Sequence, residues 1–341
     1  MPSGDHTPAP DTDRLLPADA PVLPTEAPAI PGFADLQPLA RGAHTVVYRA
    51  RQDRLDRVVA LKVLPASAAD HPRRVAHFER EARLAIRLSH PNIVAAFDHG
   101  VHAGHHWLAL EYLDGHSLET LLARGGAMDE RRAVRLVLQV AEALAYLAEA
   151  GIVHRDIKPA NVVLHQRGVA KLCDLGFARA VDEPDLDEEG FTLGTPNYIS
   201  PEQARGTTAV DARSDCYSLG ATFYHMVTGE PPFAGANAAD IMARHIAEAP
   251  VPPRARSGAS EELSWIIERL LAKAPEDRYP SPAALVRDLE EYAAGTFRVP
   301  SRVASESSLR LLRVRPAIPV AEPAAPLAAE PPAPRRRWRR R

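Results

Sequence analysis

The sequence predicts an α+β fold of two unlike lobes, a small lobe of β-strands with one helix and then a large, mainly helical lobe. Two observations lead to this prediction. Runs of β-branched and aromatic residues come first in the block 33–295, and after Gly115 the apolar residues recur at helical spacing. Strands followed by helices in this order favour two lobes with a cleft between them.

Four strands and one helix are expected in the small lobe. The strands are 45–48, 58–64, 93–97 and 107–112, which are rich in branched or aromatic residues. Between the second and third of them, residues 72–88 repeat apolar side chains every three or four positions. This spacing predicts an amphipathic helix that covers the sheet.

The large lobe is expected to begin with a long helix. Asp129 is a suitable N-cap for it, its apolar residues follow at helical spacing, and Gly151 ends it. Four later helices are predicted by the same periodicity, at 214–226, 238–247, 260–272 and 281–292.

Composition excludes several classes of protein. The 341 residues are 45% hydrophobic and 25% charged, and the formal net charge of -3 gives no sign of sequence-specific nucleic-acid binding. Cys173 and Cys216 lie in apolar stretches, so we expect free thiols, a reducing compartment and a cytoplasmic location. We find neither a secretory signal nor an apolar run long enough for a membrane helix.

The two ends of the chain differ from the block between them. Residues 1–32 and 296–341 are rich in Pro and Ala, and we expect both tails to be disordered. Residues 335–341 hold six arginines around Trp338. Three readings are left open. They are weak contact with an anionic membrane, which would place the protein at the membrane periphery, contact with nucleic acid or an acidic partner, and no role beyond solubility.

The sharpest chemical signal is the segment 154–161. It places Asp156, Lys158 and Asn161 on a polar loop after an apolar helix. The aspartate can accept a hydroxyl proton, the lysine can neutralise charge on a moving phosphoryl group, and the asparagine can hold Mg²⁺. Each residue alone could be an ordinary loop residue, but the whole segment favours phosphoryl transfer.

Two further residues fit the same chemistry. Asp174 ends an apolar run and precedes Leu175 and Gly176, so its carboxylate can approach a phosphate-bound Mg²⁺. Lys62 lies inside an apolar strand, where a buried ammonium needs a partner. Glu81 on the predicted helix is our candidate for that partner and Glu79 is the competitor, since the two point to opposite sides of a helix.

Together these motifs resemble those of the protein kinase family, in its bacterial, eukaryotic-like serine/threonine type. The resemblance covers residues 33–295 and includes 194–198, 200–202, 215–220 and an Arg278 that would pair with Glu202. It implies a bilobal fold with a small antiparallel sheet lobe at 33–113 and a large lobe at 114–295.

The resemblance also implies an activity and roles for single residues. The expected reaction transfers the γ-phosphoryl of ATP, with Mg²⁺, to Ser or Thr hydroxyls of protein substrates, and no motif indicates an oligomeric state. Asp156 would be the catalytic base, Lys158 and Asn161 would contact phosphate and metal, Asp174 would bind Mg²⁺, and Lys62 with Glu81 would position the phosphates. The expected nucleotide-binding residues are Ala40, Gly42, Val47, Ala60, Lys62, Leu110, Glu111, Leu113 and Val163.

The glycine-rich loop departs from the family pattern. Of its three glycines only Gly42 remains, while Ala40 and Thr45 replace the other two. Backbone N–H groups approach phosphates less easily there, so we expect weaker ATP handling. A pseudokinase scaffold that binds nucleotide weakly is therefore one alternative. A small-molecule kinase and a binding module that works through its tails are two others.

The segment between Asp174 and Glu202 carries a regulatory prediction. Its middle, 182–189, is strongly acidic, and it is read either as a solvated loop or as a partial substitute for a phosphate facing Arg155. We expect autophosphorylation in this segment, with Thr192 as the favoured site, because a phosphate there could order the loop against Arg155.

Overall fold

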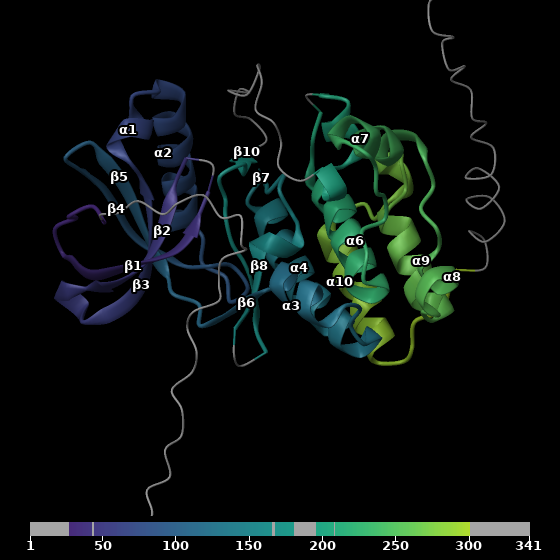
Figure 1. The fold of residues 1–341 in the computed structure, drawn as a ribbon. Helices are drawn as coiled ribbons and strands as arrows, with labels where there is room; N and C mark the ends of the chain where they lie inside the picture. Colours follow the sequence, from purple (N-terminus) through teal and green to yellow (C-terminus); the bar gives the residue numbers. More distant parts are fainter. Residues whose placement is uncertain (1–26, 43, 166–167, 181–195, 208, 301–341) are drawn as a thin grey trace, which may run out of the picture. The chain divides into compact units, whose positions relative to one another are not determined.

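The structure is a computed structural model that describes residues 27–42, 44–165, 168–180, 196–207 and 209–300. Within these ranges a sheet-based small lobe is followed by a helical large lobe (Figure 1). The predicted α+β fold of two unlike lobes is therefore confirmed. The predictions for residues 1–26 and 301–341 lie outside the described residues.

The small lobe is built on one five-stranded antiparallel sheet. Its order is β1-β2-β3-β5-β4, so β1 and β4 form the edges. The strands are β1 Phe33–Arg41, β2 Val46–Gln52, β3 Arg57–Leu64, β4 Ala96–His102 and β5 His105–Glu111. The predicted strand 93–97 was placed too early, because β4 begins at Ala96 and continues through the polar residues to His102.

The two faces of β3 have different environments. Val59, Leu61 and Val63 are buried on one face, in a cluster that also takes in Ile30 and Tyr48. Ala60 and Lys62 alternate with them and point to the opposite face. The alternation therefore turns the side chain of Lys62 toward helix α2 rather than toward the outer cluster.

Helix α2, Pro72–Arg87, covers that second face of the sheet and follows the short helix α1, Ala66–Ala69 (Figure 1). Phe78, Ala82 and Ala85 are buried against Leu64 and Leu108. The predicted amphipathic helix is thus confirmed, and its apolar stripe carries Glu81 to the inner side of the lobe.

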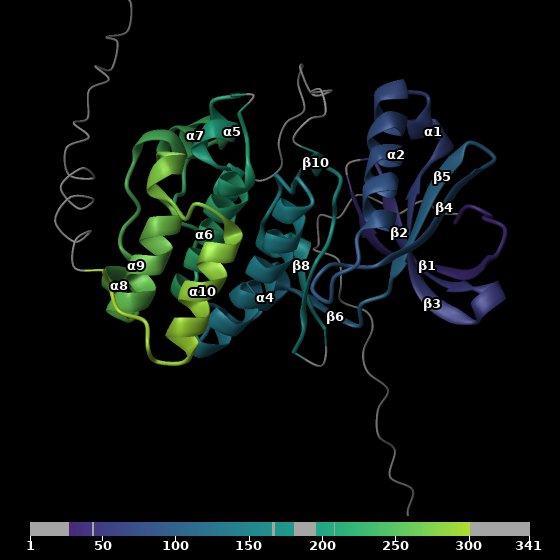
Figure 2. The same cartoon turned by 180° about the vertical axis from the view of Figure 1, so that it is seen from behind.

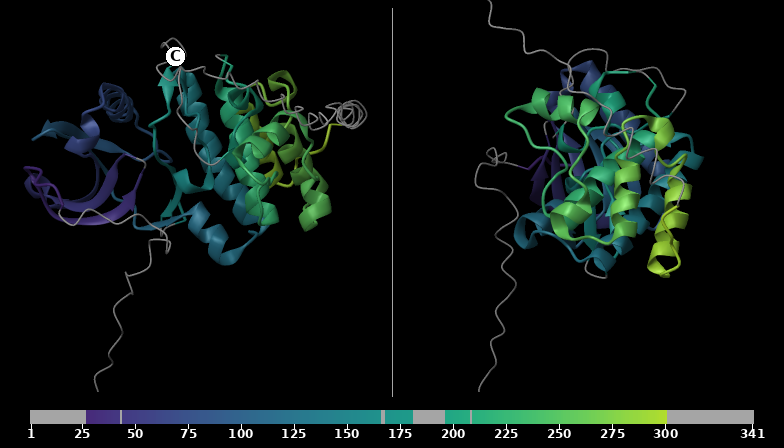
Figure 3. Two further views of the ribbon diagram at one scale, coloured as in Figure 1. Left: turned by 45° about the horizontal axis from the view of Figure 1, so that its top comes forward. Right: turned by 90° about the vertical axis from the view of Figure 1, so that its right-hand side faces the viewer.

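The large lobe packs helices around a core formed mainly by α4, α6, α9 and α10 (Figure 2). Figure 3 shows these helices from two further sides. The helices are α3 Leu118–Gly125, α4 Glu130–Glu149, α5 Pro201–Ala204, α6 Ala212–Thr228, α7 Ala238–Ala247, α8 Pro253–Ser257, α9 Glu261–Leu270 and α10 Pro282–Ala293. The short strands are β6 Gly115–Ser117, β7 Ile152–Val153, β8 Val162–His165, β9 Ala170–Leu172 and β10 Arg179–Ala180.

The helix ends follow the capping residues in the sequence. Asp129 caps α4 by accepting a hydrogen bond from the N–H of Arg132, while Ser260 and Ser281 cap α9 and α10. Gly151 has a φ of 68°, in the left-handed region that suits a residue just past a helix. The predicted helices are confirmed with bounds that differ by no more than a few residues.

Packing reaches slightly beyond the block 33–295. Ile30 is 2% exposed in the small-lobe cluster, and Phe297 is 5% exposed in the large-lobe core, where it contacts Trp265.

Among the described residues, no helix combines the length and apolar character needed to cross a bilayer.

Candidate active site

The centre of the site is a lysine shared by two carboxylates. Lys62 Nζ donates to Glu81 Oε1 at 2.7 Å and Oε2 at 2.8 Å, and to Asp174 Oδ1 at 2.9 Å. The competitor Glu79 instead lies 3.5 Å from Arg83 and 3.7 Å from His106, and its side chain is 45% exposed against 6% for Glu81. The structure therefore brings together Lys62 of β3, Glu81 of α2 and Asp174, which lies two residues past β9.

The charges at this centre favour one another. Burial alone would lower the pKa of Lys62, but the carboxylates of Asp174 and Glu81 outweigh it and raise the pKa above its ordinary value. The ammonium of Lys62 in turn lowers the pKa of Asp174 to about 2. Lys62 and Asp174 are consequently both ionised at neutral pH.

Gly176 allows the carboxylates to approach this closely. A Cβ on Gly176 would lie 3.1 Å from Asp174 Oδ1 and 3.5 Å from Glu81 Oε2. Its N–H also donates to Asp174 Oδ1 at 3.3 Å. Asp174 itself has a φ of 62°, a strained backbone conformation for a residue other than glycine.

A second group forms around Asp156 on the loop after β7. Lys158 Nζ donates to both carboxylate oxygens of Asp156, at 3.0 and 2.8 Å. Asn161 Nδ2 donates to the main-chain oxygen and to Oδ2 of the same residue, each at 2.8 Å. Because both of these bonds use the amide nitrogen of Asn161, its amide oxygen is left for a cation.

The two groups are joined through the backbone. The N–H of Cys173 donates to the carbonyl of Asn161 at 2.8 Å, which places Asn161 beside the residue that precedes Asp174. All six polar residues predicted from the sequence to be catalytic or metal-binding therefore belong to one connected site: Lys62, Glu81, Asp156, Lys158, Asn161 and Asp174.

Asp215, for which the sequence predicted no role, fixes the backbone just before Asp156. Asp215, buried near the start of α6, accepts hydrogen bonds from the N–H groups of His154 and Arg155, both at 2.8 Å. Gln203 Nε2 adds a bond to the carbonyl of Arg155 at 2.8 Å. An aspartate inside an otherwise buried helix was the available sequence signal, since such a carboxylate needs N–H partners.

The predicted nucleotide-binding residues lie on strands that border this centre. Ala60 pairs with Leu110 across β3 and β5, and Val47 pairs with Lys62 across β2 and β3. Val163 is on β8, opposite Lys171 of β9. Ala40 and Gly42 lie at the exposed end of β1, and Leu113 follows β5 in the connection to the large lobe.

Glu111 and Lys171 form an ion pair that the sequence did not reveal. Lys171 Nζ donates to Glu111 Oε2 at 2.8 Å, and the same oxygen accepts from the N–H of Ala95 at 3.3 Å. The pair joins the end of β5 to β9, three residues before Asp174. It therefore links the connection between the lobes to the strand that positions Asp174.

The reduced glycine loop is closed by its own turn. The N–H of Gly42 donates to the carbonyl of Thr45 at 2.8 Å, and a Cβ on Gly42 would lie 2.8 Å from Thr45 Oγ1. A side chain at position 42 would therefore have to displace the hydroxyl of Thr45, the residue that replaces a glycine three positions later. Residue 43, between them, lies outside the described residues.

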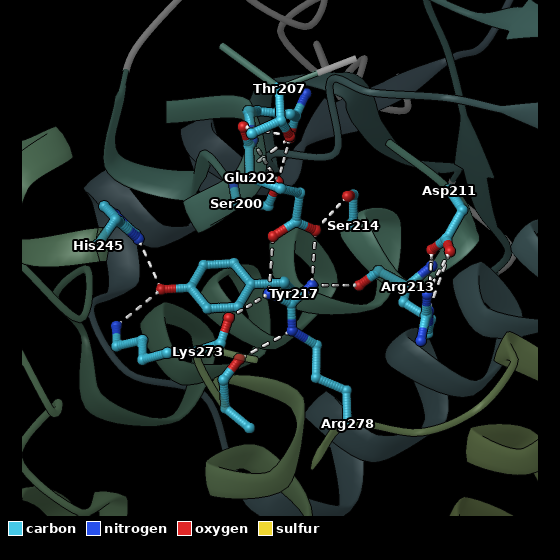
Figure 4. A network of polar contacts seen from close by, with 12 residues as sticks. Ser200, Glu202, Thr207, Asp211, Arg213, Ser214, Tyr217, His245, Lys273 and Arg278 are labelled. Carbon is cyan, nitrogen blue, oxygen red and sulfur yellow. Dashed lines mark hydrogen bonds and ion pairs between the residues drawn. The ribbon is translucent and has the colours of Figure 1, made fainter. Parts of the chain in front are cut away.

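A buried network of polar contacts holds residues 200–207, on the C-terminal side of the acidic stretch 182–189 (Figure 4). Arg278, whose side chain is fully buried, donates to Glu202 Oε1 at 2.7 Å and to Oε2 at 2.8 Å, as predicted for this pair. The same guanidinium donates to the carbonyls of Ala272, Arg213 and Lys273. Burial opposes ionisation of Glu202, but the bonds from Arg278 outweigh it and keep the pKa of Glu202 below its ordinary value.

Comparison with known proteins agrees with this geometry. The family model for the protein kinase domain matches residues 33–288. The chain belongs to the protein kinase family. The kinase domain is 40% identical over 263 residues to the serine/threonine-protein kinase PknB of Mycobacterium leprae and 41% identical over 258 residues to PknB of Mycobacterium tuberculosis. It is 39% identical over 264 residues to the serine/threonine-protein kinase pkn3 of Myxococcus xanthus.

These matches cover most of the kinase chain but less of the relatives. They include 75%, 74% and 74% of this chain and 42%, 41% and 48% of the respective relatives. The chain thus spans less than half the length of these curated relatives. The prediction of a bacterial, eukaryotic-like serine/threonine kinase family is confirmed.

The donor atoms of the kinase site suit Mg²⁺. The carboxylate of Asp174 and the amide oxygen of Asn161 are hard oxygen ligands, and Mg²⁺ in such sites takes one or two protein groups with phosphate oxygens and water.

Part of the sequence prediction lies outside the described residues. This applies to Thr192 and to the acidic stretch 182–189, with their expected interaction with Arg155.

Proposed function

We propose that this chain is an active serine/threonine protein kinase that transfers the γ-phosphoryl group of ATP to hydroxyl groups of protein substrates. The observation that carries the proposal is the connected site of Lys62, Glu81, Asp174, Asp156, Lys158 and Asn161. Its kinase relatives bear serine/threonine-protein kinase names, which supports the hydroxyl specificity. Their greater length leaves the full activity of this chain a proposal.

Each residue of the site has a distinct part in the proposed reaction. Asp156 accepts the proton of the attacking hydroxyl, and its carboxylate is held in place by Asn161 and Lys158. Lys158 also neutralises charge on the phosphoryl group as it moves. Lys62, kept cationic by Asp174 and Glu81, binds the α- and β-phosphates.

Asp174 and Asn161 would hold Mg²⁺, which supplies charge neutralisation at the β- and γ-phosphate oxygens. The adenine would lie between Val47, Ala60 and Val163, with Leu110 behind it and the backbone of Glu111 and Leu113 along its edge. Ala40 and Gly42 would cover the phosphates. The Gly42–Thr45 turn supports the expectation of weaker ATP binding than a loop with three glycines gives.

The remaining sequence predictions are kept as parts of this proposal. They are autophosphorylation at Thr192, a cytoplasmic location consistent with the free thiols of Cys173 and Cys216, and weak contact of residues 335–341 with an anionic membrane or acidic partner. A pseudokinase scaffold is the alternative, but the ionised pair of Lys62 and Asp174 supports catalysis instead.

The test is phosphotransfer from labelled ATP with Mg²⁺ to a generic protein substrate, followed by phosphosite mapping. The parent chain should label Ser and Thr, and Asp156→Asn should lose at least about a hundredfold in rate. Both proteins should still bind Mg-ATP. Equal phosphotransfer by both would show that Asp156 is not the catalytic base, and no phosphotransfer by the parent while it binds nucleotide would favour the scaffold instead.

A further inference from the structure

Three arginines gather on the exposed face of the first two turns of α4. Arg131, Arg132 and Arg135 are all exposed, and within the described part of the chain their side chains take part in no hydrogen bond or ion pair. An unpaired group of cations on one helical face is a surface for anions.

The placement of these arginines opposes the helix dipole. The N-terminal end of a helix of 20 residues is positively polarised, and cations there are unfavourable for helix stability. Glu130 is the one acidic residue of this first turn, but its carboxylate is occupied by Ser260, at 2.9 Å from both N and Oγ, and by Tyr292 at 2.6 Å. The carboxylate of the N-cap Asp129 already faces the positive end of the helix dipole, so the attraction of this face for an anion comes from the three arginines.

A pocket with an apolar floor lies directly beside the arginines. It has a volume of about 460 Å³ and lies between β6, α3, α4 and β8. Leu121, Leu136 and Leu164 supply apolar surface, and Arg132 and Arg135 line the same pocket. Asp114 is the only acidic side chain among its lining residues. Such a site suits an acidic segment with one apolar side chain in its middle.

The sequence contains a segment of this description. Residues 182–189 read Asp-Glu-Pro-Asp-Leu-Asp-Glu-Glu, so that six carboxylates surround the single apolar Leu186. Their charge is opposite to that of Arg131, Arg132 and Arg135. The match includes both components of the pocket, since the leucine side chain suits the apolar floor and the flanking acids suit the arginines.

We propose that the α4 surface, defined by Arg131, Arg132, Arg135 and the adjoining pocket, binds residues 182–189 of a second copy of this chain, with Leu186 in the pocket. In one copy the segment lies between Ala180 of β10 and Pro196, so its two ends are held within its own domain. A second copy presents the segment to this face without that restriction.

Docking of this kind has a consequence for autophosphorylation. This consequence rests on the proposed kinase function. Thr192 follows Leu186 by six positions, a reach of up to about 20 Å in an extended chain. Leu164 of the pocket lies on β8, which starts directly after Asn161, and is therefore about 10 Å along the strand from that residue. The docked segment would hold Thr192 of one copy within range of Asp156 of the other.

Binding is tested with the full chain and a fluorescent peptide of residues 181–191, by anisotropy. The peptide should bind, and its affinity should fall as salt is raised from about 50 to about 300 mM. The double variant Arg132→Glu/Arg135→Glu should bind it at least about tenfold more weakly. A peptide with Leu186→Ser should lose several-fold on the parent chain.

Controls separate this site from other basic surfaces. Arg287→Glu on α10 changes another exposed arginine and should leave peptide affinity unchanged, as should deletion of residues 335–341. A peptide with lysine at the six acidic positions should bind the double variant and not the parent. Loss of binding on deletion of 335–341, or equal affinity of parent and double variant, would overturn the proposal.

Two further outcomes decide between this occupant and other anions. If the peptide does not bind while vesicles of phosphatidylglycerol or a DNA duplex bind through Arg132 and Arg135, the proposed occupant is wrong. In phosphotransfer, the double variant should phosphorylate an Asp156→Asn copy several-fold more slowly than the parent does, and a generic substrate at the same rate. A chain that phosphorylates neither substrate refutes the proposed function, and the peptide measurement still tests the docking.

Discussion

Replacement of Arg278 by methionine should be among the most destabilising single changes in the large lobe. The guanidinium is fully buried and donates two bonds to Glu202, at 2.7 and 2.8 Å, and three more to main-chain carbonyls. Methionine fills part of the space but leaves the carboxylate of Glu202 without its cation. Removal of one partner of a buried pair costs about 3 to 5 kcal/mol, because the other charge stays buried.

The assay is urea denaturation followed by circular dichroism, with thermal melting as a second measure. A loss of about 3 kcal/mol corresponds to a fall in melting temperature of roughly 6 to 12 °C for a domain of this size. Arg213→Met is the matched control, because Arg213 pairs with Asp211 at 2.7 Å on the surface, where both side chains are over a third exposed. That control should cost less than about 1 kcal/mol.

A second variant tests the physical reason. Glu202→Gln/Arg278→Met removes both charges, so it should be less destabilised than the sum of the single changes, by about 1 to 3 kcal/mol. If Arg278→Met costs less than about 1 kcal/mol, or if the two changes are additive, the buried charge is not the source of the effect.

Three further predictions concern single groups. Glu81→Gln should lower kcat/KM for ATP by roughly tenfold to a hundredfold, because Lys62 is then misplaced. The control Glu79→Gln should leave kcat/KM nearly unchanged. Equal effects of the two changes would contradict the pairing of Lys62 with Glu81. Burial raises the pKa of the Cys173 thiol to about 12. Its alkylation by iodoacetamide at pH 8, followed by peptide mass spectrometry, should therefore be about a thousandfold slower than that of free cysteine. A rate within tenfold of free cysteine would show an accessible thiolate. Burial lowers the pKa of His245 from 6.5 to about 3. The free energy of unfolding should therefore fall on acidification between these two pH values, by up to about 1.4 kcal/mol per pH unit. Urea titrations at several pH values should show a flatter slope for His245→Gln.

The sign of the His245 effect follows from proton binding. Its imidazole is fully buried and accepts or donates at Nδ1 to the hydroxyl of Tyr217, 2.9 Å away. Between pH 3 and 6.5 the unfolded chain binds a proton that the folded chain excludes. Stability is therefore fully present above pH 6.5 and is lost as the pH falls toward 3. Identical pH profiles of parent and variant would rule out this residue as the source.

The sequence was most informative where local pattern and local chemistry coincide. Lys62 lies in a run of alternating apolar residues and Glu81 lies on the apolar stripe of α2, so periodicity alone placed the two on facing surfaces. The loop with Asp156 and Asn161 was found because all its polar groups are close in sequence. In these places a spacing of a few residues determines the geometry.

Features that depend on distant contacts were not found from local sequence. Strand β1 contains Pro38 and several exposed residues, and it exists because it pairs with β2 along one edge of the sheet. The bonds of Asp215 to the 154–155 backbone join positions about 60 residues apart, and Glu111 with Lys171 is a pair of the same kind. Only the tertiary fold brings such groups together, so periodicity carries no sign of them.

Ile30 has a practical consequence for any shortened form of this protein. The family match begins at residue 33, but the side chain of Ile30 is 2% exposed and packs in the cluster with Tyr48, Val59 and Leu61. A version starting at residue 33 would uncover this hydrocarbon surface on the outer side of the sheet, a surface prone to self-association. Expression and crystallisation of an isolated catalytic unit should therefore begin upstream of Ile30.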